Sequence, residues 1–480
     1  MSELTDLPDL ACARFGARAL AANDEFFAEK ENLLKPEKPI FVEERFTDRG
    51  KWMDGWETRR RRTPGHDWCV LRLGLPGVVR GVVVDTSFFR GNYPEACGLD
   101  ACAIDGDPDE ATRWIELLPR SKLQGDARNV FAITCPWRVT HLRLNIHPDG
   151  GVARLRVHGE VVPAPRGGEL DLAGLDNGGV VLATSDRFFG PPHFMLQPGP
   201  ALGMHDGWET RRRRGPGHDW AVVRLAAEGV VARAEIDTAF FKGNFPDSCS
   251  LEACDAAGEQ VAEILPRSTL RADRLHVFAT ELRPHAPTAH VVLRIFPDGG
   301  VARLRLWGRP SAPGRAAMAL GWLNALAPAE AEATLLRCCG SRAWAQRMAV
   351  ARPFTSAPAL IEAAARIWRE LSSDDWREAF AAHPRIGERR VADAQAAREQ
   401  SGVGGASPET LAALAQGNRA YESRFGHVFL VCATGKSADE MLALLGRRLE
   451  SDAETELRVA AEEQRKIAEL RLKKLLEGAA

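Results

Sequence analysis

A long internal repeat constrains the fold of this 480-residue chain more than any other feature of its sequence. Residues 54–102 match residues 206–254 without a gap at an offset of 206 − 54 = 152, and 31 of the 49 positions are identical. Shared hydrophobic patterning alone would not require this identity, so the chain contains two copies of one structural unit. We predict a first domain at residues 1–165 and a second domain at residues 166–312.

Each copy has the sequence pattern of an antiparallel β-sandwich. Runs such as VVRGVVVD, VFAITC and HLRLNI are rich in β-branched residues, and clusters of Gly, Pro and Asp separate them. Long helical periods are absent from the sequence of both copies. Many short strands joined by turns favour a sandwich, and the jelly roll is the version that we predict.

After the second copy the composition shifts to Ala, Leu, Glu and Arg. The segment SAPGRAA suits a hinge, and apolar residues then recur at helical spacing. Ser407 before Pro408, and Ser437 three residues before Glu440, are typical of helix N-caps. We predict an all-α helical domain at residues 316–480. The predicted fold class is therefore multidomain, with two tandem all-β jelly-roll sandwiches followed by an all-α helical domain.

Charge and cysteine content exclude several classes of protein. Lys and Arg total 63 against 65 Asp and Glu, which gives no reason to expect a nucleic acid or an anionic membrane as partner. The N-terminus lacks a signal-peptide pattern and no apolar run is long enough for a membrane span, so we expect a cytoplasmic protein. We interpret Cys97, Cys102 and their copies Cys249 and Cys254 as buried thiols in a reducing compartment. We predict no cofactor and no metal, and we expect a homo-oligomer.

One stretch of each copy concentrates polar side chains. In the first copy it contains Asp54, Trp56, Glu57, Arg59 to Arg62, His66 and Asp67, and the second copy repeats it with Glu209, Arg211, Arg213, His218 and Asp219. If the stretch is a strand, Glu57, Arg59 and Arg61 share one face, where guanidinium groups can bind a carboxylate. The alternative is that the arginines coat a solvated edge strand. Because both copies keep these polar residues although 49 − 31 = 18 positions differ, a functional site is favoured.

The DGWETRRRR…GHDW block of both copies, with the SDRFF and NDEFFAEKENLL segments and the FFRGN motif, resembles allantoicase across residues 7–312. The resemblance implies two jelly-roll repeats that hydrolyse allantoate to ureidoglycolate and urea. That reaction needs a proton for the leaving urea nitrogen and a base for water or for the remaining N–H. The candidate catalytic residues are His66 and Asp67 or their copies His218 and Asp219, with Glu57 and Glu209 as alternatives. The glutamates and Arg59, Arg61, Arg211 and Arg213 are the candidates for substrate binding, and the sequence leaves open which repeat is active and whether a metal takes part.

The helical domain carries HPRIGE at 383–388, AREQSGVG at 397–404, NRAYESRFGHVFLVCATG at 418–435 and KIAELRLKKL at 466–475. Together they resemble the 2-oxo-4-hydroxy-4-carboxy-5-ureidoimidazoline (OHCU) decarboxylase family. The resemblance implies a substrate site made by His383, Pro384, Glu399, Gln400 and Arg471. In this assignment His383 acts on the substrate hydroxyl with help from Glu399, and Arg471 anchors the anionic edge. Backbone groups near Phe425 and Val431 receive the ureido arm, and no metal is needed if hydrogen bonds stabilise the enolate-like charge.

Two other interpretations remain open at this stage. Tandem β-sandwiches also occur as ligand-binding modules, here with a scaffold helical domain, and fold alone does not decide function. The other is that only one half is catalytic. The chain has only 2 Tyr and a repeated cluster of Arg, Glu, His and Asp, which favours small-molecule ureido substrates over a carbohydrate or protein ligand. The two reactions are not consecutive, because allantoin must first be opened to allantoate.

Overall fold

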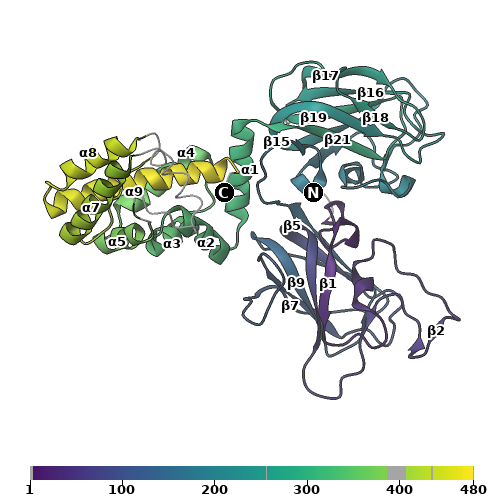
Figure 1. Cartoon of the computed structure of the whole chain (residues 1–480). Coiled ribbons are helices and arrows are strands. Elements are labelled where there is room, and N and C mark those ends of the chain that lie inside the picture. The colour runs from purple at the N-terminus through teal and green to yellow at the C-terminus, as the bar shows by residue number, and fades with distance from the viewer. Residues whose placement is uncertain (1–3, 256, 384, 386–406, 434–435, 479–480) are drawn as a thin grey trace. The chain divides into compact units, whose positions relative to one another are not determined.

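The computed structural model describes residues 4–255, 257–383, 385, 407–433 and 436–478. It divides into two compact units, Met1–Ala327 and Pro328–Ala480 (Figure 1). Within the described residues, the first unit contains the strands of both repeats, short 3-10 helices and a single α-helix, and the second unit is helical. Two β-rich domains followed by a helical region confirm the predicted fold class.

The first repeat folds around one seven-stranded antiparallel sheet. Its strands are β1 (Arg18–Ala22), β5 (Asp67–Asp85), β6 (Ala96–Cys102), β7 (Ile115–Lys122), β8 (Arg128–Ala132), β9 (Arg138–His147) and β11 (Arg154–Val161). They are ordered β1-β5-β9-β6-β7, and β8 and β11 also pair with β5. Short strands form the pairs β2 (Phe46–Thr47) with β3 (Gly50–Lys51) and β4 (Trp56–Glu57) with β10 (Gly151–Val152).

Strand β5 is long enough to take part in both layers of the sandwich. Its first part pairs with β1 and β9, and Asp67 lies opposite Ile146. The register shifts between Arg72 and Gly77, and the part that follows pairs with β11 and β8. A Cβ atom on Gly77 would lie 2.1 Å from the carbonyl oxygen of Glu160, so the crossing requires glycine.

The second repeat has the corresponding strand order. Its strands are β12 (Leu170–Asp171), β13 (Val180–Thr184), β14 (Trp208–Glu209), β15 (Asp219–Asp237), β16 (Ser248–Cys254), β17 (Gln260–Thr269), β18 (Leu275–Phe278), β19 (Thr288–Phe296), β20 (Gly300–Val301) and β21 (Arg303–Pro310). In its main sheet β12 is added beside β21 as an eighth strand. The long strand β15 corresponds to β5 and pairs with β19 first and β21 afterwards. Short 3-10 helices join the strands of the two repeats at Leu4–Asp6, Ala13–Phe15, Lys30–Leu34, Leu175–Asn177, Pro192–Leu196 and Met204–Asp206.

Matching side chains fill the cores of the two sandwiches. Trp56 and Trp208 are fully buried, and their indole N–H groups donate to the carbonyl oxygens of Asp24 and Asp186 at 2.8 and 2.9 Å. The recurring cysteines Cys97, Cys102, Cys249 and Cys254 lie buried on β6 and β16 as free thiols, as predicted.

A buried ion pair also recurs in both repeats. Arg154 Nη2 donates to Asp54 Oδ2 at 2.7 Å, and Arg303 Nη2 donates to Asp206 Oδ2 at 2.9 Å. Both guanidinium groups donate in addition to the backbone carbonyl of the same aspartate. The first aspartate of each repeated motif therefore serves the fold.

Helix α1 (Ala312–Ala325) belongs to the first unit. Ser311 caps it by accepting from the N–H of Gly314 at 3.0 Å, and the Ser311 hydroxyl donates to Glu228 Oε1 at 2.7 Å. A Cβ on Gly314 would lie 2.1 Å from the Glu228 carbonyl oxygen. The segment that the sequence suggested as a hinge is therefore the first turn of a helix that rests on β15, because its serine, proline and glycine suit a capped N-terminus.

The second unit is a helical domain. Its helices are α2 (Pro328–Cys338), α3 (Arg342–Val350), α4 (Ala357–Arg369), α5 (Ser373–Ala381), α7 (Pro408–Phe425), α8 (Ala438–Arg448) and α9 (Ala453–Leu476). Ser407 caps α7, and Ser437 forms a capping box with Glu440 at α8, which confirms both predicted caps. No helix within the described residues is both long and apolar enough to cross a membrane.

Candidate active sites

The polar stretch of repeat 1 continues as a loop after a very short strand. Strand β4 ends at Glu57, and Thr58 bonds Gly150 through its backbone and its hydroxyl. The backbone N–H groups of Arg59 and Arg61 then donate to the carboxylates of Asp24 and Asp149 at 3.0 and 2.8 Å. Side-chain carboxylates thus take the N–H groups that a neighbouring strand would otherwise bind, so the alternation of a strand does not apply beyond Glu57.

Asp67 is the buried anchor of this loop. Its Oδ1 accepts from Arg61 Nη1 at 2.7 Å and from Asn23 Nδ2 at 2.8 Å. Asp67 is 1% exposed, and among the described residues neither its Oδ2 nor the buried Nε of Arg61 has a hydrogen-bond partner. The carboxylate therefore holds Arg61 in place and still has one oxygen that can accept a further hydrogen bond.

Glu57 and Arg59 have different surroundings. Burial raises the pKa of Glu57 above its usual value, although Asn92 Nδ2 donates to its Oε1 at 2.7 Å. A carboxyl group with a raised pKa can act as a proton donor near neutral pH. Arg59 is exposed, and its Nε donates to Asp24 Oδ2 at 2.7 Å.

His66 and Asp67 bond to different groups. His66 Nε2 lies 3.2 Å from Asn145 Oδ1, and the ring centroid lies 4.7 Å from that of His147. Asp67 instead bonds Arg61 and Asn23, because consecutive residues at the start of β5 point to opposite sides. The two predicted catalytic residues belong to the same cluster, but no hydrogen bond joins them in the described structure.

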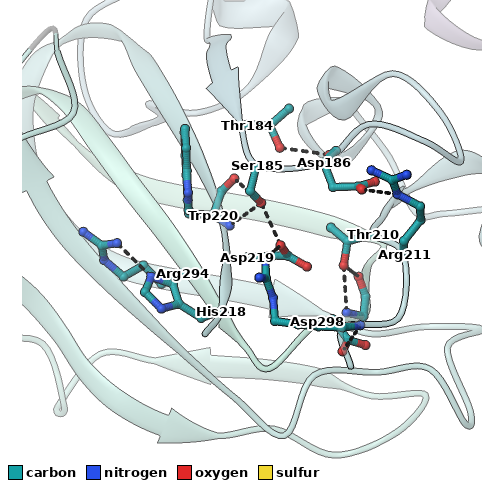
Figure 2. A network of polar contacts seen from close by, with 12 residues as sticks. Thr184, Ser185, Asp186, Thr210, Arg211, His218, Asp219, Trp220, Arg294 and Asp298 are labelled. Atoms are coloured by element: carbon teal, nitrogen blue, oxygen red, sulfur yellow. Dashed lines mark hydrogen bonds and ion pairs between the residues drawn. The ribbon is translucent and has the colours of Figure 1, made fainter. Parts of the chain in front are cut away.

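Repeat 2 reproduces most of these contacts (Figure 2). Asn244 Nδ2 donates to Glu209 Oε1 at 2.6 Å, and Arg211 Nε donates to Asp186 Oδ2 at 2.7 Å. Asp219 accepts from Arg213 Nη2 at 2.5 Å, and the hydroxyl of Ser185 occupies the place of Asn23 at 3.0 Å. The predicted residues Glu209, Arg211, Arg213 and Asp219 are thus held as in repeat 1.

His218 differs from His66 in its partner. Arg294 Nη1 lies 2.9 Å from His218 Nε2, and the ring centroid of Phe296 lies 4.9 Å from that of His218. Burial lowers the pKa of His218, and the positive charges of Arg294 and Arg213 lower it further. His218 therefore lies beside a cation that disfavours a second proton on its ring.

The sequence interpretation missed the residues that orient these groups, namely Asp24, Asn92, Asn145 and Asp149 of repeat 1 and Asp186, Asn244, Arg294 and Asp298 of repeat 2. Some carried a usable signal, since Asp24 and Asp186 stand before matching Phe-Phe pairs and Asn92 and Asn244 stand in FFRGN and FFKGN. Within the described part of the chain, no group of three or more His, Cys, Asp or Glu residues is arranged to hold a metal ion.

In the second unit, His383 follows the C-terminal end of α5. Its backbone N–H donates to the carbonyl oxygen of Phe380 at 3.0 Å, and the Phe380 ring centroid lies 5.1 Å from that of His427. Phe425, the last residue of α7, has its ring centroid 6.3 Å from that of His427. The backbone of His383 is therefore fixed at the end of α5 and the ring of Phe425 lies near that of His427, whereas the predicted residues Pro384, Glu399 and Gln400 lie outside the described residues.

The other two predicted residues lie on or beside α9. Val431 is buried, and the N–H of the next residue, Cys432, donates to Glu463 Oε2 on α9 at 2.7 Å. Arg471 lies farther along α9, near the thiols of Cys338 and Cys339. Burial raises the pKa of Cys338 to about 11, and the positive charge of Arg471 only partly opposes this. Arg471 thus presents its charge near the end of α2.

A β-sandwich pair with a duplicated cluster of polar side chains, joined to a separate helical unit, defines a two-part enzyme of small-molecule metabolism. Residues 8–162 and 170–311 match the family model described as allantoicase repeat, and residues 324–473 match the model described as OHCU decarboxylase. Because the first match covers more than half of the chain, the chain belongs to the allantoicase family. The chain joins this part to an OHCU decarboxylase part, which makes it a fused enzyme of purine catabolism.

Individual relatives agree with the family models over the β-sandwich part. The chain is 51% identical over 316 residues to probable allantoicase 2 of Burkholderia pseudomallei, and the aligned region covers 62% of this chain and 94% of that protein. It is 52% identical over 313 residues to the probable allantoicase of Nocardia farcinica, at 63% and 94% coverage. The crystal structure of allantoicase from Saccharomyces cerevisiae matches with 36% identity and a TM-score of 0.54, covering 63% of this chain and 92% of that chain.

Proposed function

We propose that the β-sandwich part hydrolyses allantoate to ureidoglycolate and urea at the cluster of Arg61, His66 and Asp67 or at its copy. The observation that carries the proposal is the buried carboxylate of Asp67, which fixes Arg61 while one of its oxygens and the guanidinium Nε have no partner within the described part of the chain. Such a pair can bind a polar ligand, because buried polar groups without hydrogen-bond partners raise the free energy of a folded protein and are rare. The substrate supplies a carboxylate and two ureido groups.

Different residues of the cluster bind the substrate, remove a proton and donate a proton while one C–N bond of the substrate breaks. The arginines hold the substrate carboxylate, as guanidinium groups do in bidentate pairs. A histidine takes a proton from water, or from the N–H of the ureido group that stays. The leaving urea nitrogen must gain a proton, and Glu57 is suited to donate it because its pKa is raised by burial. The products are then urea and ureidoglycolate, with one water consumed.

For the helical part we propose decarboxylation of OHCU to (S)-allantoin. His383 acts on the substrate hydroxyl with Glu399, and Arg471, Pro384 and Gln400 bind the substrate. Loss of CO₂ leaves an enolate-like charge that hydrogen bonds must stabilise until carbon is protonated. The family match over residues 324–473 supports this reaction.

We propose further that the enzyme works without a cofactor or metal, as a homo-oligomer in the cytoplasm. Ten free cysteines support a reducing compartment. The sequence predicts modules at residues 1–165, 166–312 and 316–480, and because α1 belongs to the first compact unit we propose that the hydrolase part extends to Ala327. Light scattering of the purified protein tests the oligomer, and a mass equal to one chain would contradict it.

The first experiment incubates the purified full-length protein with allantoate, with and without a chelator, and measures urea and ureidoglycolate over time. Urea release above the blank, insensitive to chelator, is the expected result. A folded protein that releases no urea would refute the proposed hydrolase. Decarboxylation is followed separately as the appearance of (S)-allantoin by circular dichroism.

A further inference from the structure

The histidines of the two repeats form hydrogen bonds of opposite direction. In repeat 1 the group beside His66 Nε2 is an amide oxygen, Asn145 Oδ1, at 3.2 Å. In repeat 2 the group beside His218 Nε2 is a guanidinium nitrogen, Arg294 Nη1, at 2.9 Å (Figure 2). An oxygen can only accept and a guanidinium can only donate, so the two rings must present different nitrogens as N–H.

The orientation of the Asn145 amide is fixed by its second partner. Asn145 Nδ2 donates to Asp100 Oδ2 at 2.8 Å. A flipped amide would bring two acceptor oxygens together at Asp100 and is therefore unfavourable. Asn145 Oδ1 must then face His66, which donates from Nε2 and keeps the lone pair of Nδ1. Among the described residues, none forms a hydrogen bond with this Nδ1.

In repeat 2 the same reasoning gives the opposite tautomer. Arg294 Nε donates to Glu252 Oε2 at 2.8 Å, which directs Nη1 toward His218. His218 accepts at Nε2 and therefore carries its proton on Nδ1. A second proton would have to replace the bond from Arg294 and place a positive ring beside that guanidinium.

The difference arises from where the arginine stands on the sheet. Asp100 on β6 and Glu252 on β16 are equivalent residues of the repeat. Asp100 binds an arginine two residues before Asn145, Arg143, at 2.8 Å from Nη2. In repeat 2 the position of Arg143 is Val292, and the arginine stands instead at the position of Asn145. Both positions lie on one face of the strand, so in repeat 2 the guanidinium stands two residues farther along the strand than in repeat 1, next to the histidine.

We propose that proton transfer during hydrolysis takes place in repeat 1 alone, with His66 Nδ1 as the base and Asn145 as the positioning residue. The cluster of repeat 2 has the same fold, but the Nε2 lone pair of its histidine already accepts from Arg294, so the ring has only its Nδ1–H to offer a substrate. This inference rests on the proposed hydrolysis of allantoate. It does not follow from the repeated motif, because both copies of the motif contain the histidine and the aspartate.

The charged groups around each ring are consistent with this division. Around His66 and its neighbour His147 they are Asp100, Arg120 and Arg143, and around His218 they are Arg213, Asp219, Glu252 and Arg294. Asn145, a neutral residue, separates His66 from the Asp100–Arg143 pair. His218 has no such neutral neighbour between its Nε2 and Arg294.

The test compares His66→Gln and His218→Gln in the full-length enzyme with allantoate as substrate. We expect His66→Gln to lower kcat at least about 100-fold, the usual contribution of a general base, and His218→Gln to keep at least about a tenth of kcat. Nitrogen-15 NMR of the labelled protein, with each variant used for assignment, should show His66 protonated on Nε2 and His218 protonated on Nδ1. The opposite tautomers, or a loss of kcat that follows His218, would overturn the inference.

A graft between repeats tests the positioning role. Replacing Asn145 by Arg together with Asp100→Glu and Arg143→Val gives repeat 1 the partners of repeat 2, and we expect the His66 tautomer to change and kcat to fall about 100-fold with the fold retained. Loss of activity without a change of tautomer would refute the assignment of Asn145. If the unmodified enzyme releases no urea at all, the proposed hydrolysis itself fails, which is a distinct outcome.

Discussion

Replacing Arg154 by Met should destabilise the first unit by about 3–5 kcal/mol, the cost of leaving one member of a buried ion pair alone. The side chains of Arg154 and Asp54 are 2% and 7% exposed. The guanidinium donates to the Asp54 carboxylate and to the carbonyl oxygens of Asp54, Ala153 and Glu37. The substitution keeps much of the apolar stem but leaves these acceptors buried without their donor.

Urea denaturation followed by tryptophan fluorescence measures the effect on the free energy of unfolding. The matched control is Arg80→Met, which removes an exposed pair with Glu160 and should cost less than about 1 kcal/mol. Adding Asp54→Asn to Arg154→Met should recover part of the loss, because it removes the uncompensated buried charge. Equal costs for Arg154→Met and Arg80→Met would refute the reasoning, and kcat per folded molecule should stay unchanged.

Three further predictions concern pH and the second unit. Burial raises the pKa of Asp171 to about 6, so the folded state binds more protons than the unfolded state between about pH 4 and 6. The free energy of unfolding should therefore fall, by at most about 3 kcal/mol, as pH rises through that window. The variant Asp171→Asn should flatten this change when urea melts at pH 4.5 and pH 7 are compared. The variant Arg448→Met removes the cationic partner of the fully buried Glu456. It should lower the thermal stability of the helical unit and the rate of decarboxylation, while urea release continues at the normal rate. His383→Gln should lower decarboxylation at least about 100-fold in the circular dichroism assay, and an unchanged rate would remove His383 from the mechanism.

The order of domains could be predicted from the sequence because it depends on local patterns. Alternation, turn residues and the repeat itself define the sandwiches, and Ser407 and Ser437 mark helix starts through contacts three residues away. The interpretation of SAPGRAA as a hinge failed for a physical reason. Its partner Glu228 is 83 residues from Ser311, and no local pattern reveals such a contact.

The residues of the cluster could be predicted from their types, but their hydrogen-bond partners could not. Arg59 bonds Asp24, which is 35 residues away, and Arg61 bonds Asp149, which is 88 residues away. The tautomer of His66 depends on the register that places Asn145 beside it and Asp100. Spacing in the sequence gives candidates for catalysis, whereas the direction of each proton depends on strand pairing.

The capped start of α1 bears on how the gene can be divided. Gly314 lies against β15, and Ala319, Leu320 and Leu323 are buried. A truncation at residue 315 would remove most of this helix and expose the surface that it covers. A hydrolase fragment intended for expression alone should therefore extend to Ala327. A gene divided after that residue would keep α1 with the β-sandwich product and begin the helical product at α2.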